Sequence, residues 1–158
     1  MKKRTAILLL LCLILSLAAC GHEAAAPSYA FDDLSIQIPE DYINLSDEEF
    51  AAGLDFLFGL DPIAVNGLRE EKATFEAYGL QIDLQTYGKY LMKANNVSGE
   101  LEEKDGILSF SYESGDFTYV VTLHESQNAF WTVQAYCPTE DFPKSEEKMW
   151  QILSSVTV

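Results

Sequence analysis

The chain has 158 residues, with 10 basic and 25 acidic side chains and a formal net charge of −15. Three of the basic residues stand at the start, so residues 20–158 carry 7 basic and 25 acidic side chains, a net charge of −18. This balance excludes a surface that binds DNA or RNA by neutralising phosphates. The eight Tyr, nine Phe and two Trp all follow residue 19, which argues against disorder and indicates one folded domain.

The first 19 residues are typical of a secretory signal peptide. A positively charged start, Met1–Arg4, precedes an uncharged, leucine-rich run of 14 residues that ends at Ala19. As a helix, this run would span about 21 Å, which is short of the roughly 30 Å hydrocarbon core of a bilayer. We therefore predict that residues 1–19 are removed and do not remain as a membrane anchor.

The end of this segment resembles the lipobox of bacterial lipoproteins, with Leu17, Ala18, Ala19 and Cys20 at its four positions. In that family a diacylglycerol is thioether-linked to the cysteine, and a peptidase cuts before it. The resemblance implies that Cys20 is lipidated and that Leu17, Ala18 and Ala19 form the cleavage site. It also implies anchoring in the cell membrane on the extracytoplasmic face, because two acyl chains hold a protein stably on a bilayer.

A flexible tether is predicted between the lipid and the domain. The segment 21–30 is small, mostly polar and without periodicity, which gives a reach of about 18 Å. We place the lipidated cysteine and tether at 20–30 and a single domain at 31–158. Cys12 leaves with the signal peptide and Cys20 carries lipid, so Cys137 has no partner for an intrachain disulfide.

The first half of the domain gives mixed signals. Apolar residues alternate with polar ones from Leu34 to Ile38, which predicts a half-buried strand. The residues Ser46–Glu49 match a capping box with Ser46 as N-cap, so a short helix is expected there. Residues 54–60 fit either a helix or a strand. A turn at Asp61-Pro62 should then lead into an extended segment that ends near Arg69.

The second half shows clearer periodicity. Asp83 is expected to cap a helix over 84–94 that stops at Asn95-Asn96, and Pro143 to begin a helix that ends before a short C-terminal strand. Between these helices the apolar period is two, with turns near Gly106, Gly115 and Gln127. We predict an antiparallel meander with strands at 100–104, 107–113, 117–125 and 129–137.

These elements predict an α+β fold with an antiparallel meander sheet flanked by helices. The segments Leu34–Tyr42, Tyr87–Asn95, Ala129–Cys137 and Met149–Val156 resemble small lipoproteins of Gram-positive gut bacteria that have the PsbP-like α/β/α sandwich. The same sandwich occurs in an extrinsic subunit of photosystem II and in a nuclear-import factor. Members of this fold mostly bind partners, so the resemblance implies binding by analogy only.

No catalytic motif is complete in the chain. His124-Glu125 begins like a zinc-protease motif, but Asn128 stands where the second histidine is required. We expect His124 to face solvent opposite Phe130. Cys137 should face Phe117, too far from His124 for a nucleophile–base pair, and should be an inert core thiol. Ser145 and Lys148 have the Ser-x-x-Lys spacing of penicillin-recognising enzymes without the companion motifs, so we expect an exposed helix start.

Acidic and aromatic side chains remain as candidates for binding. Carboxylates cluster at 47–49, at 100–105 and around 140–147, without the spacing of a calcium-binding loop, and we expect a solvated surface. Aromatic residues crowd the meander, so either helices cover both sheet faces or one face carries an exposed binding patch. The residues concerned are Phe110, Tyr112, Phe117, Tyr119, Phe130, Trp131 and Tyr136.

The function expected from the sequence is a non-catalytic, lipid-anchored module without cofactor or metal. Its partner would be an unidentified protein, peptide or envelope component, and its acidic surface favours a basic one. Two alternatives stay open, which are a sensor or carrier of a small ligand or divalent cation, and a hydrolase that uses a pair of carboxylates.

Overall fold

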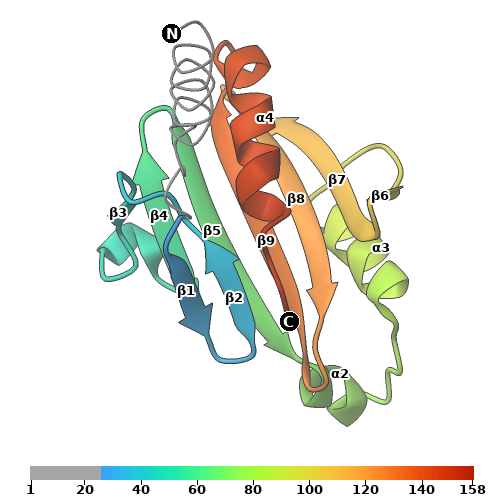
Figure 1. The fold of residues 1–158 in the computed structure, drawn as a ribbon. Helices are drawn as coiled ribbons and strands as arrows, with labels where there is room; N and C mark the ends of the chain where they lie inside the picture. Colours follow the sequence, from blue (N-terminus) through green and yellow to red (C-terminus); the bar gives the residue numbers. More distant parts are fainter. Residues whose placement is uncertain (1–25) are drawn as a thin grey trace, which may run out of the picture.

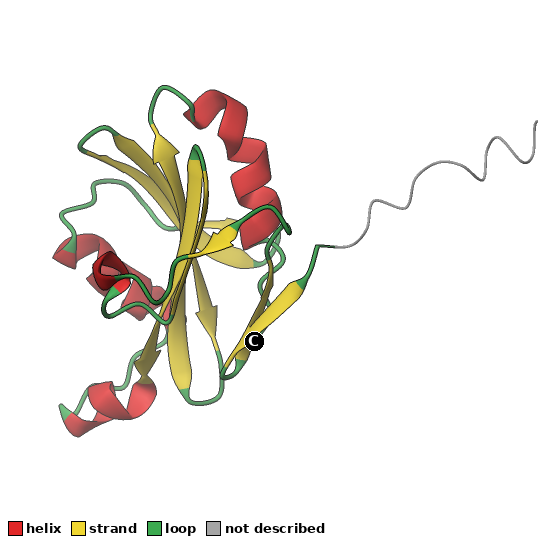
Figure 2. Cartoon of the chain, turned by 90° about the vertical axis from the view of Figure 1, so that its left-hand side faces the viewer, coloured by secondary structure: helices red, strands yellow, loops and turns green. Residues whose placement is uncertain are grey.

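The computed structural model describes residues 26–158, so the predicted signal peptide, the lipobox and Cys20 lie outside it. A seven-stranded antiparallel sheet forms the centre of the domain, and a two-stranded hairpin lies against one face (Figure 1). Helices flank the sheet on both faces (Figure 2). The predicted α+β class, with its meander sheet flanked by helices, is confirmed. Among the described residues, no helix is long and apolar enough to cross a bilayer.

The large sheet has the strand order β3-β4-β5-β9-β8-β7-β6. Every neighbouring pair in it is antiparallel. Its strands, in chain order, are β3 (Ile43–Asn44), β4 (Phe56–Leu60), β5 (Ile63–Glu71), β6 (Glu102–Lys104), β7 (Ile107–Ser114), β8 (Phe117–Glu125) and β9 (Ala129–Pro138). The four-stranded meander β6–β9 therefore matches the predicted strands to within about two residues.

The register of the meander differs by one residue from the prediction between β8 and β9. His124 faces Trp131 and Cys137 faces Thr118, where Phe130 and Phe117 were expected. The reason is the turn, in which Ser126 takes part through its side chain. Its hydroxyl accepts the N–H of Ala129 at 3.0 Å, so that four residues separate the paired ends Glu125 and Phe130.

Strand β9 lies in the middle of the sheet and is buried on both faces. Trp131 and Cys137 face one core, and Phe130 faces the other. The first core is closed by helix α4 (Phe142–Leu153) and the hairpin, and the second by helices α2 (Lys72–Ala77) and α3 (Leu84–Ala94). The period-two pattern thus predicted β9 correctly. Of the seven aromatic residues in the meander, Phe110, Phe130 and Trp131 lie in the two cores, and the other four are only partly buried.

The hairpin consists of β1 (Ser28–Phe31) and β2 (Leu34–Gln37), which corrects the predicted boundary of the tether. Residues 28–30, predicted to belong to the flexible tether, form a strand. The ring of Tyr29 packs 4.8 Å from Phe58, and that of Phe31 stacks 4.5 Å from Phe56, measured between centroids. Packing of these two rings against the sheet fixes the segment, so a strand starts at Ser28, inside the predicted tether.

The capping box predicted at Ser46 is wrong. The hydroxyl of Ser46 accepts the N–H of Leu57 at 2.9 Å, and the N–H of Leu45 donates to the Leu57 carbonyl at 2.8 Å. The short 3-10 helix η1 (Glu49–Ala51) starts later and has no side-chain cap. Ser46 thus closes the outer edge of β4, and the open question at 54–60 is decided in favour of a strand.

The helices that pack on the sheet follow the sequence signals, except for α2, which was missed. Asp83 caps α3, accepting the N–H of Thr86 at 2.7 Å, and α4 starts within one residue of the predicted position. Gly88 lets α3 approach the sheet closely, because a Cβ there would lie 2.5 Å from a methyl carbon of Leu123. The predicted C-terminal strand is reduced to one bridge between Thr157 and Ser35.

Candidate binding surface

His124 is buried, which corrects the expectation that it faces solvent. Only 9% of it is exposed, and its Nε2 lies 3.0 Å from the hydroxyl oxygen of Thr122. Burial lowers the pKa of His124 to about 4, so the ring is neutral at physiological pH. The expectation was wrong because this face of the sheet is covered: His124 pairs with the buried Trp131, on the face that α4 and the hairpin close.

The other two catalytic candidates are also parts of the core. Cys137 is fully buried as predicted, its Sγ lies 3.8 Å from Sδ of Met149, and burial raises the pKa of its thiol. Its pairing partner Thr118 is six positions from His124 along β8, about 20 Å at 3.3 Å per residue. Ser145 is 5% exposed within α4, so the exposed helix start expected there is wrong.

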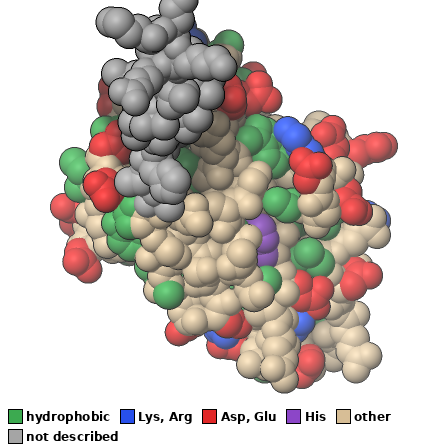
Figure 3. All heavy atoms as spheres, viewed as in Figure 1, with side chains coloured by type: hydrophobic (Ala, Val, Ile, Leu, Met, Phe, Trp, Pro, Cys, Tyr) green, Lys and Arg blue, Asp and Glu red, His purple; other side chains and the backbone are tan. Residues whose placement is uncertain are grey.

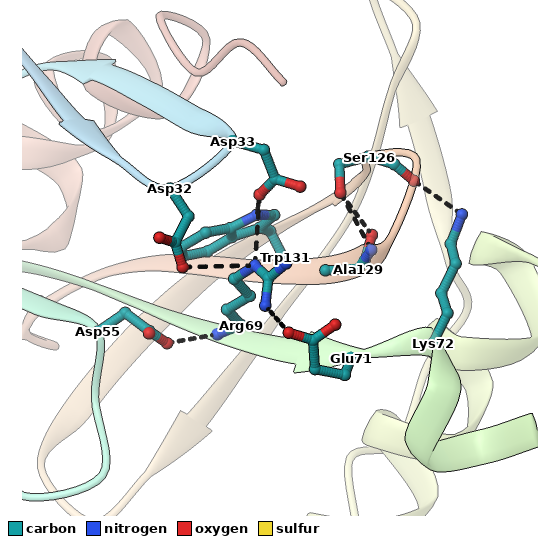
Figure 4. A network of polar contacts seen from close by, with 9 residues as sticks. All are labelled: Asp32, Asp33, Asp55, Arg69, Glu71, Lys72, Ser126, Ala129 and Trp131. Carbon is teal, nitrogen blue, oxygen red and sulfur yellow. Dashed lines mark hydrogen bonds and ion pairs between the residues drawn. The ribbon is translucent and has the colours of Figure 1, made fainter. Parts of the chain in front are cut away.

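A polar network joins the hairpin to the sheet (Figure 4). Asp33, in the turn between β1 and β2, accepts hydrogen bonds from the indole N–H of Trp131 at 2.8 Å and from Nε of Arg69 at 3.3 Å. Asp32 lies 3.8 Å from the same guanidinium, which also pairs with Glu71. Since these charges satisfy one another across three elements, the network holds the hairpin in place and offers no reactive group.

Carboxylates elsewhere form no metal-binding cluster in the part of the chain that the structure describes. No group of three or more Asp, Glu, His or Cys side chains is arranged there to hold a metal ion. Lys72 is similarly engaged, donating to Glu125 and to the carbonyl of Ser126 at 2.7 Å each. The alternative that depends on a cation therefore gains no such cluster from the described residues.

A row of tyrosine rings crosses three strands on the sheet face that α3 covers in part. Tyr112 of β7 stacks on Tyr119 of β8 with 4.7 Å between centroids, and Tyr119 stacks on Tyr136 of β9 at 5.1 Å. Phe117 meets Tyr136 edge-on at 6.0 Å and is 39% exposed. We call these four residues the tyrosine row. Each ring is only partly buried, so the row is a surface and not a third core.

The phenol groups of the row are suited to hydrogen bonding. Partial burial, with a smaller contribution from neighbouring Tyr119, raises the pKa of both Tyr112 and Tyr136 above the ordinary value of 10. The phenols of Tyr112 and Tyr136 therefore stay protonated at physiological pH. Because the rings stack on one another, they offer edges and hydroxyls outward more than open faces.

A groove of about 390 Å³ lies beside the tyrosine row. Its walls are the segment Asn95–Ser98, which follows α3, and the end of β7 with the neighbouring Tyr119. On the other side of Tyr136, the positions paired in line with the row are small residues. Ala64 of β5 pairs with Tyr136, and Gly59 of β4 pairs with Ala64. The result is a shallow aromatic surface bounded by a groove on one side and by small residues on the other.

The three strands that carry the tyrosine row belong to a segment of the chain that has acidic side chains and no basic ones. Residues 105–143, which include the last three strands of the meander, contain six acidic side chains and no Lys or Arg. Asp116, in the turn beside Phe117, is exposed, and Glu113 is exposed on the opposite face of β7. Acidic side chains also dominate the rim of the opposite, α4-covered face (Figure 3). The net charge of −18 over residues 20–158 gives the domain as a whole a negative potential, while Lys89 and Lys93 of α3 are the basic side chains on the helix that covers this face in part.

Comparison with known proteins supports the fold. Neither a protein-family model nor a curated protein sequence matches the chain. The solution structure of cyanobacterial PsbP (CyanoP) from Synechocystis sp. PCC 6803 is similar, with a TM-score of 0.55 and 14% identity over 89% of this chain and 97% of that one. The chain thus has a PsbP-like fold, as the sequence pattern predicted.

A crystal structure of a protein from Bacteroides thetaiotaomicron VPI-5482 is also similar, with a TM-score of 0.54 and 13% identity. The match covers 85% of this chain but 48% of that chain, so this protein spans about half the length of the Bacteroides protein. At these identities the likeness shows the fold and nothing more. The lipoprotein nature and the Gram-positive origin stay predictions.

The buried histidine predicts a pH-dependent stability. The native state keeps His124 neutral down to about pH 4, whereas the unfolded chain binds a proton below about 6.5. Stability from this group is therefore complete above pH 6.5 and is lost as the pH falls toward 4. We expect a loss of about 2 kcal/mol between pH 7 and pH 5. Urea unfolding of the wild type and of His124→Gln at both pH values measures it, and equal losses in both proteins would contradict it.

Proposed function

We propose that the protein is a membrane-anchored extracytoplasmic lipoprotein whose domain is a non-catalytic binding module for another protein or peptide. The observation that carries this proposal is the tyrosine row beside a groove, on a domain with a strongly acidic balance of charges. The catalytic candidates His124, Cys137 and Ser145, by contrast, are buried side chains. Because the fold alone is shown by comparison, the binding role rests on this surface.

Tyrosine is the residue type that this role requires. Its ring supplies a large contact area at little cost in conformational entropy, and its hydroxyl can bond a polar group at the edge. Stacking holds the rings of Tyr112, Tyr119 and Tyr136 in place before any partner arrives. A preordered surface of this kind loses less freedom on binding, which favours affinity.

The charge indicates the chemistry of the partner. With 7 basic and 25 acidic residues after residue 19, the domain would repel an acidic partner and anionic lipid head groups. A partner with exposed Lys or Arg would be attracted and oriented, and its binding would weaken with added salt. A small ligand or a divalent cation remains the second candidate, and thermal stabilisation by that ligand would reveal it.

The anchor is tested at Cys20. In the proposed arrangement its thioether-linked diacylglycerol holds the domain at the membrane, and the described helices supply no spanning segment. Replacing Cys20 by Ala removes the only sulfur that could carry the lipid at the lipobox. We expect Cys20→Ala to leave the membrane fraction almost completely, measured by immunoblot after ultracentrifugation. Full retention of the variant would place the anchor elsewhere.

The binding surface is tested by crosslinked capture of the lipidated protein from its own membranes, quantified by mass spectrometry. We expect one stoichiometric partner, reduced at least tenfold by Tyr119→Ala or Phe117→Ala and by raised salt. Tyr90, 48% exposed on α3 and outside the tyrosine row, provides the matched control Tyr90→Ala. Thermal unfolding confirms that each variant is folded. Capture that the row variants leave unchanged, or no partner under several conditions, would overturn the proposal.

A further inference from the structure

The outer edge of β7 is left open over half of its length. Strand β6 pairs with residues 107–109 of β7 and ends there. Residues 110–114 pair on one side only, with β8. None of these five residues makes a backbone hydrogen bond on the other side within the described part of the chain.

The hairpin geometry shows which backbone groups face outward. Lys104 and Ile107 flank the two-residue turn Asp105-Gly106, so they form a hydrogen-bonded pair. From Ile107 on, every second residue of β7 therefore turns its N–H and C=O toward β6. Ser109 uses this side to meet Glu102. Ser111 and Glu113 turn the same way beyond the end of β6, and both are exposed. Their N–H and C=O groups are thus available to an added strand.

The opposite edge of the sheet, in contrast, is closed. There β4 is closed by the two-residue strand β3, by the N–H of Leu45 and by the hydroxyl of Ser46. Edges that need protection are also commonly blocked by proline or lysine, yet residues 110–114 contain neither. The open part of β7 is, moreover, the strand segment that carries Tyr112 and one wall of the groove.

We propose that β7 is the recognition strand of the module, and that an extended segment of a partner protein bearing Lys or Arg adds to its edge at residues 110–114. This inference rests on the proposed binding function and specifies its mode, β-strand addition. Backbone bonds to Ser111 and Glu113 supply affinity. On one face of the new strand, side chains enter the groove beside Tyr112, and on the other they meet the carboxylate of Glu113.

Charge decides between a foreign segment and a second copy of this chain. Pairing two β7 edges would bring together Glu113 of both copies, together with the exposed Glu102 and Glu103 of each β6. Such like-charge contacts across adjoining strands are destabilising. A basic segment meets the same carboxylates favourably, so its expected pattern is Lys or Arg alternating with apolar or aromatic residues.

The test uses the lipidated full chain in detergent and a displayed library of six-residue peptides with Lys or Arg at every second position. The variants Ser111→Pro and Glu113→Pro each remove one outward N–H, a position where an edge strand tolerates proline. Their matched controls are Ser111→Ala and Glu113→Ala, which keep it. We expect selected peptides to bind wild type and Ser111→Ala alike, and to bind Ser111→Pro at least tenfold more weakly. The same ratio is expected between Glu113→Ala and Glu113→Pro.

Three results would overturn strand addition. One is equal peptide binding by the folded proline and alanine variants. Another is that peptides with alternating basic residues are not enriched relative to a control library. That library has the same composition, but its basic residues stand next to one another. The third is a dimer of the wild type, dissociated by Ser111→Pro in sedimentation, which would assign the edge to a second copy. A membrane partner captured equally by Ser111→Pro and Ser111→Ala would leave the binding function standing and reject this mode alone.

Discussion

Burial of β9 on both faces is the constraint that arranges the rest of the domain. Its neighbours β5 and β8 pair with it along nearly its whole length, so water is excluded from its edges as well. Trp131 then needs a cover on one face and Phe130 on the other. The first cover is supplied by α4 and the hairpin, where Asp33 satisfies the indole N–H. The second includes Tyr87 of α3, which stacks on Phe130 at 4.7 Å.

The second cover is incomplete because α3 is shorter than the strands beneath it. Helix α3 has 11 residues and spans about 16 Å, whereas β8, with 9 residues, spans about 30 Å. One end of this sheet face therefore has no helix above it. Tyrosine fits such a half-covered position, because its ring packs on the sheet while its hydroxyl stays near water. The tyrosine row is thus a consequence of how far α3 reaches, and it coincides with the open stretch of β7.

The fold could be predicted from the sequence where local periodicity decided the structure. The meander, α3 and α4 followed from apolar spacing and from caps such as Asp83. The errors arose where a distant partner decided. Ser46 has a capping pattern but bonds Leu57 across the sheet, and Tyr29 and Phe31 become a strand because they pack on the rings of β4. Helix α2 has six residues and no fully buried one, and Phe75 alone packs against the core, so it left no apolar periodicity to find.

The candidate surface was within reach of sequence reasoning only in part. The two-residue turn Gly115-Asp116 already pairs Tyr112 with Tyr119, so two members of the tyrosine row could have been placed together. Tyr136 joins them only in the actual register of β9, which depends on the four-residue turn that Ser126 helps to form. The open edge of β7 depends on where β6 ends. The groove depends on the path that the chain takes after α3. Neither can be read from local spacing.

The central claim is that this domain binds its partner at the tyrosine row and the adjoining edge of β7. The most direct measurement is hydrogen–deuterium exchange of the lipidated protein in its own membranes, compared with the same protein purified in detergent. The account predicts slower exchange in the membranes at residues 95–98 and 110–119, with α4 and the hairpin unchanged. Protection confined to α4 or the hairpin, or no difference anywhere in residues 26–158, would contradict it.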